Sequence, residues 1–442
     1  MDMEMKIASG KRESVADRLE RHPTLKARME RMLDVVENVS GDVRRADEAE
    51  SRAIEELRQM GLEVMQSWGQ KASSEAALDL EVQGGVVREV KKKLHWICTF
   101  GEVTVEEQTY RTNEGGKLCR PFQSRAEVSC RGYSTRLQRA ITDFGADVPF
   151  AQVREKIHEH YGIHIANGAA ATITEGHANR MTDTDMTPEV RTTKEALTLI
   201  AEIDGSMIPM VQTGTSDDSA PQDRRKTRKL FWKEGKLSMI RREDEVAPIF
   251  AVTLGDAAAA GSDLLRLAMA AGFDKHSYVH GLGDGAIWIE DQMERQFGAQ
   301  CRYHVDFFHV CDYLSAAKVC AANDPGWMER QKDYLKTNQL PAVLTALTPF
   351  QEPDAVPSEE APVRGCYRYL TNRPGQFDYQ AAIQAGLPIG SGEVESAHRY
   401  VIQKRLKLPG AWWKPENAQS MLNLRVTRAN GGWNRYWDAI AA

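Results

Sequence analysis

Five acidic residues between positions 204 and 395 have the types and positions expected of a site for phosphodiester chemistry. Asp204 in AEIDGS and Asp284 in GLGDGA follow apolar runs, Asp306 stands in VDFFH, and Glu393 and Glu395 stand in SGEVES. Carboxylates of this kind bind hard divalent cations such as Mg²⁺ together with phosphate oxygens. Two such ions activate a nucleophile on one side of a phosphodiester and stabilise the leaving oxygen on the other.

Each of these residues also has a purely structural interpretation. Asp-Gly is a common turn, which accounts for Asp204 or Asp284 taken alone. Acidic residues in the first turn of a helix, as expected for Glu393 and Glu395, complement the helix dipole. His309 fits a satisfied core histidine. A common site is favoured because these separate acids are predicted to lie at neighbouring positions in a single fold.

The elements that would position these acids begin with residues 278–314. This stretch predicts a strand ending in GDGA, an amphipathic helix, and a second strand ending at Asp306 and His309. In open α/β sheets, chemistry gathers at the carboxyl ends of the strands. Two carboxylates are therefore expected at the ends of two strands of one sheet.

Segments on either side of this stretch extend the sheet. Residues 196–210 predict a buried strand that ends at Asp204-Gly205. Further strands are expected at 229–232, 237–240 and 249–254, and helices at 263–271 and 387–408. This order predicts an α/β fold with an RNase H-like core, in which metal-binding carboxylates lie on the first and fourth strands and on a late helix. The helical residues 315–385, between the last strand and that helix, read as an all-α insertion.

The first half predicts helices and a hairpin. Residues 13–78 show a helical apolar period, typical of helices that either pack on their own domain or dimerise. Alternation over 94–105 predicts a β-hairpin, preceded by the basic run 88–93. Residues 134–181 predict a helix-turn-helix, whose second helix, opening near Asn167 and including Thr172, would read DNA or simply pack. The predicted organisation is α+β with several domains. Its regions are 1–80 (N-terminal helices), 81–133 (β-hairpin region), 134–182 (helix-turn-helix-like region), a linker at 182–193, 195–312 (first part of the core), 313–386 (helical insertion) and 387–442 (final helices).

Composition permits DNA binding without demonstrating it. The formal net charge is −6, from 57 basic and 63 acidic residues, but basic residues cluster locally. The candidate DNA contacts are Arg224, Arg225, Lys226, Arg228, Arg399, Lys404, Arg405 and Lys407. Seven cysteines without a CxxC pair argue against a disulfide framework or a zinc ribbon. No apolar run reaches the ~20 residues that span a bilayer, and the first residues lack a signal-like apolar region, so a cytoplasmic protein is expected.

Four segments carry a resemblance to a known family. The segments AEIDGSMIPM, GLGDGAIWIEDQMERQFG, VDFFHVCDYL and PIGSGEVESAH resemble the DDE transposases of bacterial insertion sequences, chiefly the ISKra group and more distantly Mutator-like elements. The resemblance extends from about Leu197 to Arg428, and the segment 134–181 is similar to the helical DNA-binding region that precedes the core in this family. It implies an RNase H-like core with an all-α insertion before the final acid.

The resemblance also implies roles for individual residues. Asp204, Asp284 and Glu395 match the three acids that hold one or two Mg²⁺ ions, or Mn²⁺, while Asp306 and His309 line or brace the site. Glu393 departs from the family, where an apolar residue is common, which favours Glu395 as the ligand. A second departure is that only Cys119 and Cys130 stand near the hairpin, where relatives often carry paired cysteines, which argues against a zinc site there.

The activity so implied is metal-dependent cleavage and joining of DNA. A homodimer or higher oligomer would bind the terminal inverted repeats of its own element, water would attack the phosphodiester at the element end, and the liberated 3′-hydroxyl would attack target DNA. The expected location is the cytoplasm of a bacterium, in association with the nucleoid. Two alternatives stay open: a non-catalytic DNA-binding regulator derived from a transposase, and a simple RNase H-like nuclease.

Overall fold

The computed structural model describes residues 13–441 except 40, 42, 114, 184–196, 214–227 and 322–323. The chain forms two compact units, one comprising Met1–Phe144 and Ala151–Ala170, the other Gly145–Phe150 and Ala171–Ala442. Most of the predicted linker at 182–193 lies outside the described residues. Within the described part of the chain, no helix is long and apolar enough to cross a membrane.

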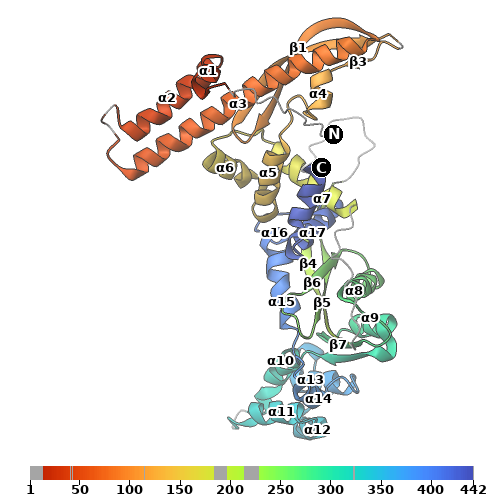
Figure 1. Ribbon diagram of the computed structural model, residues 1–442. Coiled ribbons are helices and arrows are strands. Elements are labelled where there is room, and N and C mark those ends of the chain that lie inside the picture. Colours follow the sequence, from red (N-terminus) through yellow and green to blue (C-terminus); the bar gives the residue numbers. More distant parts are fainter. Residues whose placement is uncertain are drawn as a thin grey trace, which may run out of the picture. The chain divides into compact units, whose positions relative to one another are not determined.

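The first unit combines N-terminal helices with a small antiparallel sheet (Figure 1). As predicted, residues 13–78 are mostly helical, and the alternating segment forms a hairpin whose strands run further than expected, so that β1 includes the basic run 88–93. Ala76 of α3 packs against Trp96 and Val105 of the sheet, which gives this unit its own core. Its elements are α1 (Val15–Glu20), α2 (Pro23–Glu37), α3 (Ala46–Gln83), β1 (Val86–Cys98), β2 (Gly101–Thr112), β3 (Leu118–Cys119) and α4 (Pro121–Arg125).

Three helices follow in the region predicted to be a helix-turn-helix. They are α5 (Thr135–Asp147), α6 (Phe150–Tyr161) and α7 (Ala169–Asp183), so the expected helices are present. Residues 162–168 connect α6 to α7, a longer connection than the turn of about 3–4 residues in a helix-turn-helix. The short turn that the sequence predicts is therefore wrong, and DNA reading by α7 stays a prediction.

The second unit is built on a five-stranded mixed sheet with the order β6-β5-β4-β7-β8. The strands are β4 (Thr198–Thr213), β5 (Arg228–Arg242), β6 (Ile249–Thr253), β7 (Tyr278–Gly283) and β8 (Cys301–Val305). β5 is antiparallel to β4 and β6, whereas β7 is parallel to β4 and β8. The predicted mixed α/β class is confirmed.

One strand replaces two that the sequence predicts. The polar residues between 232 and 237 suggest a turn, but β5 continues through them because Gly235 pairs with Ser206 in the ladder. A Cβ added to Gly235 would lie 2.8 Å from Cδ1 of Ile208, so only glycine lets the strand pass here without a shift of that core side chain. The predictions of separate strands at 229–232 and 237–240 are wrong for this reason.

Helices cover both faces of this sheet (Figure 1). On one face α8 and α9 bury Leu199, Ala201 and Ile203 of β4. On the other face the C-terminal helices bury Ile200 and Ile208. The helices are α8 (Ala257–Ala271), which begins six residues before the predicted start, α9 (Ile287–Phe297), α15 (Gly392–Ala397), the π-helix η5 (His398–Gln403), α16 (Lys404–Leu406), α17 (Pro415–Ala429) and α18 (Trp433–Ala441).

The segment between the last strand and α15 is helical, as predicted for an insertion. Its core gathers Val310, Leu314, Leu335, Leu370 and Tyr379. The helices are α10 (Phe307–Ala317), α11 (Trp327–Lys336), α12 (Leu340–Leu347), α13 (Pro362–Thr371) and α14 (Tyr379–Gln384). Tyr369 and Arg373, at the end of α13, reach back to the sheet.

Candidate active site

The register of the parallel strands brings the predicted aspartates level with one another. Glu202 on β4 pairs with Leu282 on β7, and Leu282 pairs with His304 on β8. Because side chains alternate between faces with a period of two, Asp204 shares a face of β4 with Glu202. The corresponding positions of the other two strands are Asp284 and Asp306, which follow directly after β7 and β8 end. β4 continues past Asp204 to Thr213, so the predicted strand end at Asp204-Gly205 is wrong.

Asp204 faces a buried histidine that sequence reasoning missed. Its Oδ2 lies 3.1 Å from Nε2 of His398, an ion-pair distance, while Oδ1 accepts a hydrogen bond from the Gly205 N–H at 2.7 Å. His398 is 4% exposed, and neither ring nitrogen has an aligned hydrogen-bond partner among the described residues. It stands three positions after Glu395 and opens the π-helix, a rare element that appears often at functional sites. That helical spacing was the available signal.

Asp284 lies in a loop that the insertion holds in place. Its Oδ1 accepts a hydrogen bond from the Ala286 N–H at 2.7 Å, and its carbonyl accepts one from the Tyr369 hydroxyl at 2.6 Å. Arg373 donates from Nε and Nη2 to the Gly285 carbonyl, at 2.9 and 2.7 Å, and its guanidinium stacks 3.8 Å above the Tyr369 ring. Burial raises the pKa of Tyr369 above the already high value of an ordinary tyrosine, so its hydroxyl stays a donor at neutral pH. The Asp284 carboxylate keeps most of its acceptor capacity.

Gly285 is required by this arrangement. Its φ is +84°, in the region that side-chain-bearing residues rarely adopt. An added Cβ would lie 2.6 Å from both Nε of Arg373 and the hydroxyl oxygen of Tyr369. Close approach of the insertion to the GDGA loop therefore depends on a glycine directly after Asp284.

Asp306 is a bracing residue in this structure. It is 2% exposed and caps α10, where Oδ1 accepts from the His309 N–H at 2.8 Å. Oδ2 accepts from the Ser391 hydroxyl at 2.6 Å and also from the Ser391 N–H. Both oxygens are thus used within the protein. His309 lies in the first turn of α10, and its ring centroid is 6.0 Å from that of Tyr369.

Three contacts fix the helix that carries Glu395. Ser391 binds Asp306, as described, and the Val394 N–H donates to Oε2 of Glu202 at 2.8 Å. Glu393 accepts two hydrogen bonds from Nε of Arg241, at 2.8 and 2.9 Å. Glu393 is therefore committed to a structural ion pair, while Glu395 in the same turn is exposed. This division agrees with the prediction that Glu395 is the acid available for chemistry.

The electrostatics tie Glu395 to two of the three aspartates, Asp306 and Asp204. Burial raises the pKa of Glu395, the carboxylates of Asp306 and Asp204 raise it further, and His309 and Arg399 lower it. Asp306 therefore acts on Glu395 more strongly than Asp204 does. Because both oxygens of Asp306 already accept hydrogen bonds, it shapes the potential at the site, and Asp284 retains the freer carboxylate.

Glu202 is a second residue that sequence reasoning missed. Burial is the main cause that raises its pKa to about 8, and Oε1 has no partner among the described residues. Its position two residues before Asp204, in an otherwise apolar strand, was the available signal. At neutral pH this side chain is mostly protonated.

The candidate ligands have the chemistry that suits a hard divalent cation, but they do not stand at the spacing of a metal site. Within the described residues, no three His, Cys, Asp or Glu side chains stand close enough together to hold a metal ion. The candidate donors Asp204, Asp284 and Glu395 are carboxylates, which Mg²⁺ prefers. Burial is the main cause of the raised pKa of Glu395, and the negative charges of Asp306 and Asp204 add to it; a cation would relieve that second effect.

The predicted DNA-contacting residues fall into separate groups. Arg399 is exposed one turn beyond Glu395, and Asn167, Thr172 and Arg228 are also exposed. Lys404 pairs with Asp147 at 3.4 Å. The partly buried Lys407 has its pKa lowered by burial, against which the Asp204 charge acts. The residues outside the described part of the chain are Arg224, Arg225 and Lys226.

The prediction that Arg405 contacts DNA is wrong. It is 3% exposed, donates from Nε to the Gly145 carbonyl at 2.9 Å, and stacks over the rings of Phe150 and Trp413. Burial lowers its pKa to about 10. Its guanidinium is enclosed by its own unit and is not available to DNA. Helical spacing from Glu395 did not reveal that this position faces the core.

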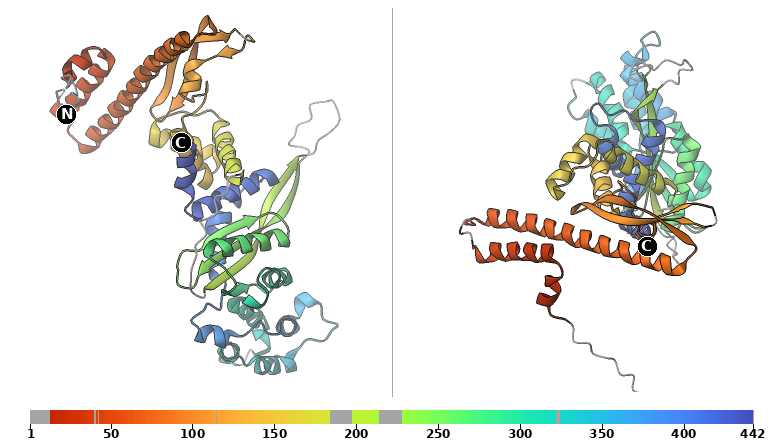
Figure 2. Two further views of the ribbon diagram at one scale, coloured as in Figure 1. Left: turned by 45° about the vertical axis from the view of Figure 1, so that its right-hand side comes forward. Right: turned by 90° about the horizontal axis from the view of Figure 1, so that it is seen from above.

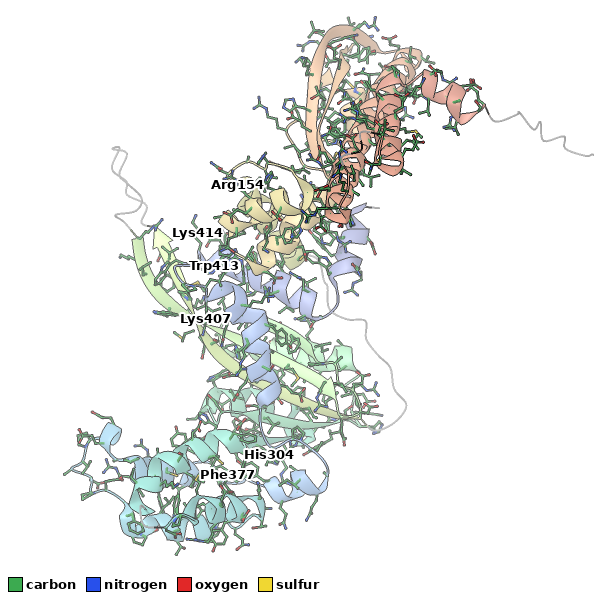
Figure 3. The ribbon with its side chains drawn as sticks, turned by 90° about the vertical axis from the view of Figure 1, so that its left-hand side faces the viewer. Arg154, His304, Phe377, Lys407, Trp413 and Lys414 are labelled. Carbon is green, nitrogen blue, oxygen red and sulfur yellow. The ribbon has the colours of Figure 1, made fainter. Side chains whose placement is uncertain are left out.

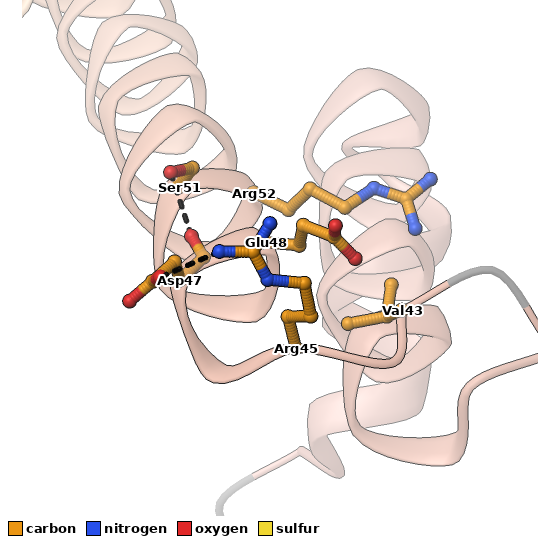
Figure 4. Close-up of a pocket in the computed structure, with 6 residues that line it drawn as sticks. All are labelled: Val43, Arg45, Asp47, Glu48, Ser51 and Arg52. Atoms are coloured by element: carbon orange, nitrogen blue, oxygen red, sulfur yellow. Dashed lines mark hydrogen bonds and ion pairs between the residues drawn. The ribbon is translucent and has the colours of Figure 1, made fainter.

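A pocket in the first unit contains none of the predicted site residues (Figure 4). It lies at the start of α3, where Arg45 pairs with Asp47 at 3.2 Å and the Ser51 hydroxyl donates to the Asp47 carbonyl at 2.7 Å. The remaining lining residues are Val43, Glu48 and Arg52. Exposed ion pairs of this kind contribute little energy, and the pocket offers no convergent set of catalytic groups.

Comparison with known proteins gives one family match. No curated protein matches the chain. Residues 271–439 match the model of an uncharacterised protein family, UPF0236. The matched part contains Asp284, Asp306 and Glu395, together with the insertion that holds the GDGA loop, and it excludes β4 with Asp204.

Proposed function

We propose that this protein is a DDE transposase with an RNase H-like core, which cuts and joins DNA at the ends of its own element. The observation that carries the proposal is the parallel register of β4 and β7, which places Asp204 on β4 beside the position of Asp284 directly after β7, while the helix that presents Glu395 is bonded to β4 through Val394 and Glu202. The strand order β6-β5-β4-β7-β8, with the first three strands antiparallel, agrees with the topology of such a core. The helical insertion before the final acid agrees with it as well.

In this proposal Asp204, Asp284 and Glu395 would hold one or two Mg²⁺ ions. A bound cation supplies Lewis-acid activation of the phosphodiester and of the attacking oxygen. Glu395 is exposed, and its carboxylate forms no hydrogen bond or ion pair with another described residue, so its side chain is free to turn toward Asp204 and Asp284. His398 restrains the Asp204 carboxylate, and the Tyr369–Arg373 pair restrains the loop of Asp284. These contacts limit reorganisation during the reaction.

The DNA backbone would approach from the exposed side of the π-helix. Arg399 lies there without an ion-pair partner among the described residues, and Lys407 lies within electrostatic range of Asp204. Both side chains are suited to phosphate oxygens beside the acids. The terminal inverted repeats, the target DNA and a homo-oligomeric assembly belong to the same proposal.

The proposal is tested by replacing Glu395 and a matched neighbour. Glu395→Gln should abolish Mg²⁺-dependent cleavage of DNA carrying the element ends, because it removes a charged ligand. Glu393→Gln is the control, since Glu393 lies in the same helical turn but serves Arg241, and this variant should keep cleavage within about tenfold of the wild type. Equal loss in both variants, or cleavage retained by the folded Glu395→Gln protein, would contradict the assignment.

A DNA-binding regulator without catalysis is the second candidate. The specific observation in its favour is that no three candidate ligands stand at metal-binding spacing among the described residues. A regulator would bind end DNA equally well with and without Mg²⁺ and would never nick it. Titration of Mg²⁺ and Mn²⁺ in binding and nicking assays separates the two.

A further inference from the structure

Among the described residues, the outer part of the β4–β5 pair has an exposed apolar face. β7 pairs with β4 only over Thr198–Glu202, and β6 pairs with β5 only over Lys236–Ile240. Beyond these limits β4 and β5 continue as a two-stranded arm (Figure 2). Trp413 bridges to Met210 at the edge of this arm, through hydrogen bonds to Val211 and Pro209 (Figure 3).

The two faces of the arm differ in burial. On the inner face Ile208, Met210 and Trp413 are buried in the core of the unit. The alternate positions form the opposite face, where Pro209 pairs with Trp232 and Val211 with Leu230. Four large side chains of that face are exposed, and we call them the tryptophan patch: Met207 (48%), Leu230 (54%), Trp232 (57%) and Trp412 (40%).

The two indoles of the patch lie side by side. The ring centroids of Trp232 and Trp412 are 6.3 Å apart at an interplanar angle of 62°. They come from different parts of the chain, Trp232 from β5 and Trp412 from the segment that bridges to β4. An exposed cluster of this kind indicates a surface that a ligand covers.

The charges beside the patch favour a polyanion. Arg228 pairs with Thr213 and so belongs to the same face as Trp232, and Lys414 follows two residues after Trp412. Lys229 and Lys233 pair with Gln212 and Ile208, so they belong to the opposite face of the arm. All four cations are exposed, and none of them forms an ion pair with another described residue. Lys236, further along β5, is by contrast neutralised by Glu234 at 2.7 Å. Exposed aromatic rings among unpaired cations are the arrangement by which proteins bind single-stranded nucleic acid, where bases stack on rings and cations follow the phosphates.

We propose that the tryptophan patch binds unpaired bases of the DNA on which the protein acts. This inference rests on the proposed function, because DNA is there the substrate. In a duplex the base faces are hidden by stacking, so Trp232 and Trp412 can contact base faces only where strands are separated or frayed. The patch would thus distinguish opened ends from intact duplex, a discrimination that the acids alone do not provide.

The test measures DNA binding by the full-length protein in EDTA, so that no cleavage is needed. Fluorescence anisotropy compares a labelled blunt duplex with the same duplex carrying a single-stranded tail. Trp232→Ala and Trp412→Ala should each weaken binding of the tailed DNA by roughly 5- to 150-fold, the range measured for loss of one stacked base. Binding of the blunt duplex should change by less than about threefold. Trp232→Phe and Trp412→Phe should restore most of the lost affinity, because they keep a ring.

The matched control is Trp68→Ala in the first unit, since Trp68 is 47% exposed and lies on α3, outside the tryptophan patch. Equal effects of Trp68→Ala and Trp232→Ala on tailed DNA would overturn the proposal. So would patch variants that bind both DNAs normally but sediment as smaller species, because the patch would then cover a second copy. Failure of the proposed function appears separately, as normal binding by the wild type with no Mg²⁺-dependent cleavage.

Discussion

Asp306→Asn and Asp284→Asn should separate a bracing carboxylate from a ligand. Asp306 accepts hydrogen bonds from the His309 N–H, the Ser391 N–H and the Ser391 hydroxyl while almost fully buried. An asparagine keeps one acceptor oxygen and places an amide NH₂ against at least one of these donors. A hydrogen bond to a charged group contributes about 1.5–3 kcal/mol, so Asp306→Asn should lower the free energy of unfolding by about 2–4 kcal/mol. Asp284→Asn should cost less than about 1 kcal/mol, because an amide oxygen can still accept from Ala286.

The effects on catalysis should run in the opposite order. Under conditions where both variants are folded, Asp306→Asn should keep end cleavage within about tenfold of the wild type. Asp284→Asn should lose several kcal/mol of transition-state stabilisation, roughly 10²–10⁴ in rate. Urea unfolding followed by circular dichroism gives the stabilities, and single-turnover cleavage gives the rates. The reasoning is refuted if Asp306→Asn is as stable as the wild type but inactive while Asp284→Asn still cleaves.

Two further predictions follow from buried contacts. Gly285→Ala should destabilise the protein by about 2–4 kcal/mol and slow cleavage, because the Cβ meets Arg373 and Tyr369 at a positive φ; unchanged thermal unfolding and cleavage would contradict the geometry. Glu202 has a folded pKa of about 8, above its unfolded value, so its contribution to stability is present at low pH and is lost as the pH rises through about 8. Urea titrations between about pH 4.5 and pH 8 should show this loss, with no further loss above about pH 8, and Glu202→Gln should flatten it. An equal pH dependence in wild type and variant would exclude Glu202 as its source.

The elements around the acids could be predicted because their patterns are local. The strands before Asp284 and Asp306 and the helix between them follow from short-range periodicity and Gly-Asp punctuation. β5 was predicted as two strands, because the room that Gly235 leaves for Ile208 depends on a neighbouring strand. A local sequence pattern contains no information on how closely two strands that are distant in the sequence approach each other.

The site itself was only partly predictable for the same reason. Acidic residues stand out at strand ends, so Asp204 and Asp284 could be named, but the burial that makes Asp306 a brace arises from the distant Ser391. Arg405 shares the helical spacing of exposed cations, yet it faces the core. The sequence does not reveal His398 as a site residue, because Asp204, which it faces on the sheet, is 194 positions away.

The most direct test of the account is strand transfer by the purified wild-type protein. DNA flanking the reading frame serves as the donor and a plasmid as the target, with Mg²⁺ or Mn²⁺ present. The account predicts nicks at the borders of inverted repeats, 3′-hydroxyl ends joined to the plasmid, and loss of both products in Asp204→Asn and Glu395→Gln. Specific binding of the flanking DNA without any nick or joined product, at every concentration of either metal, would contradict it.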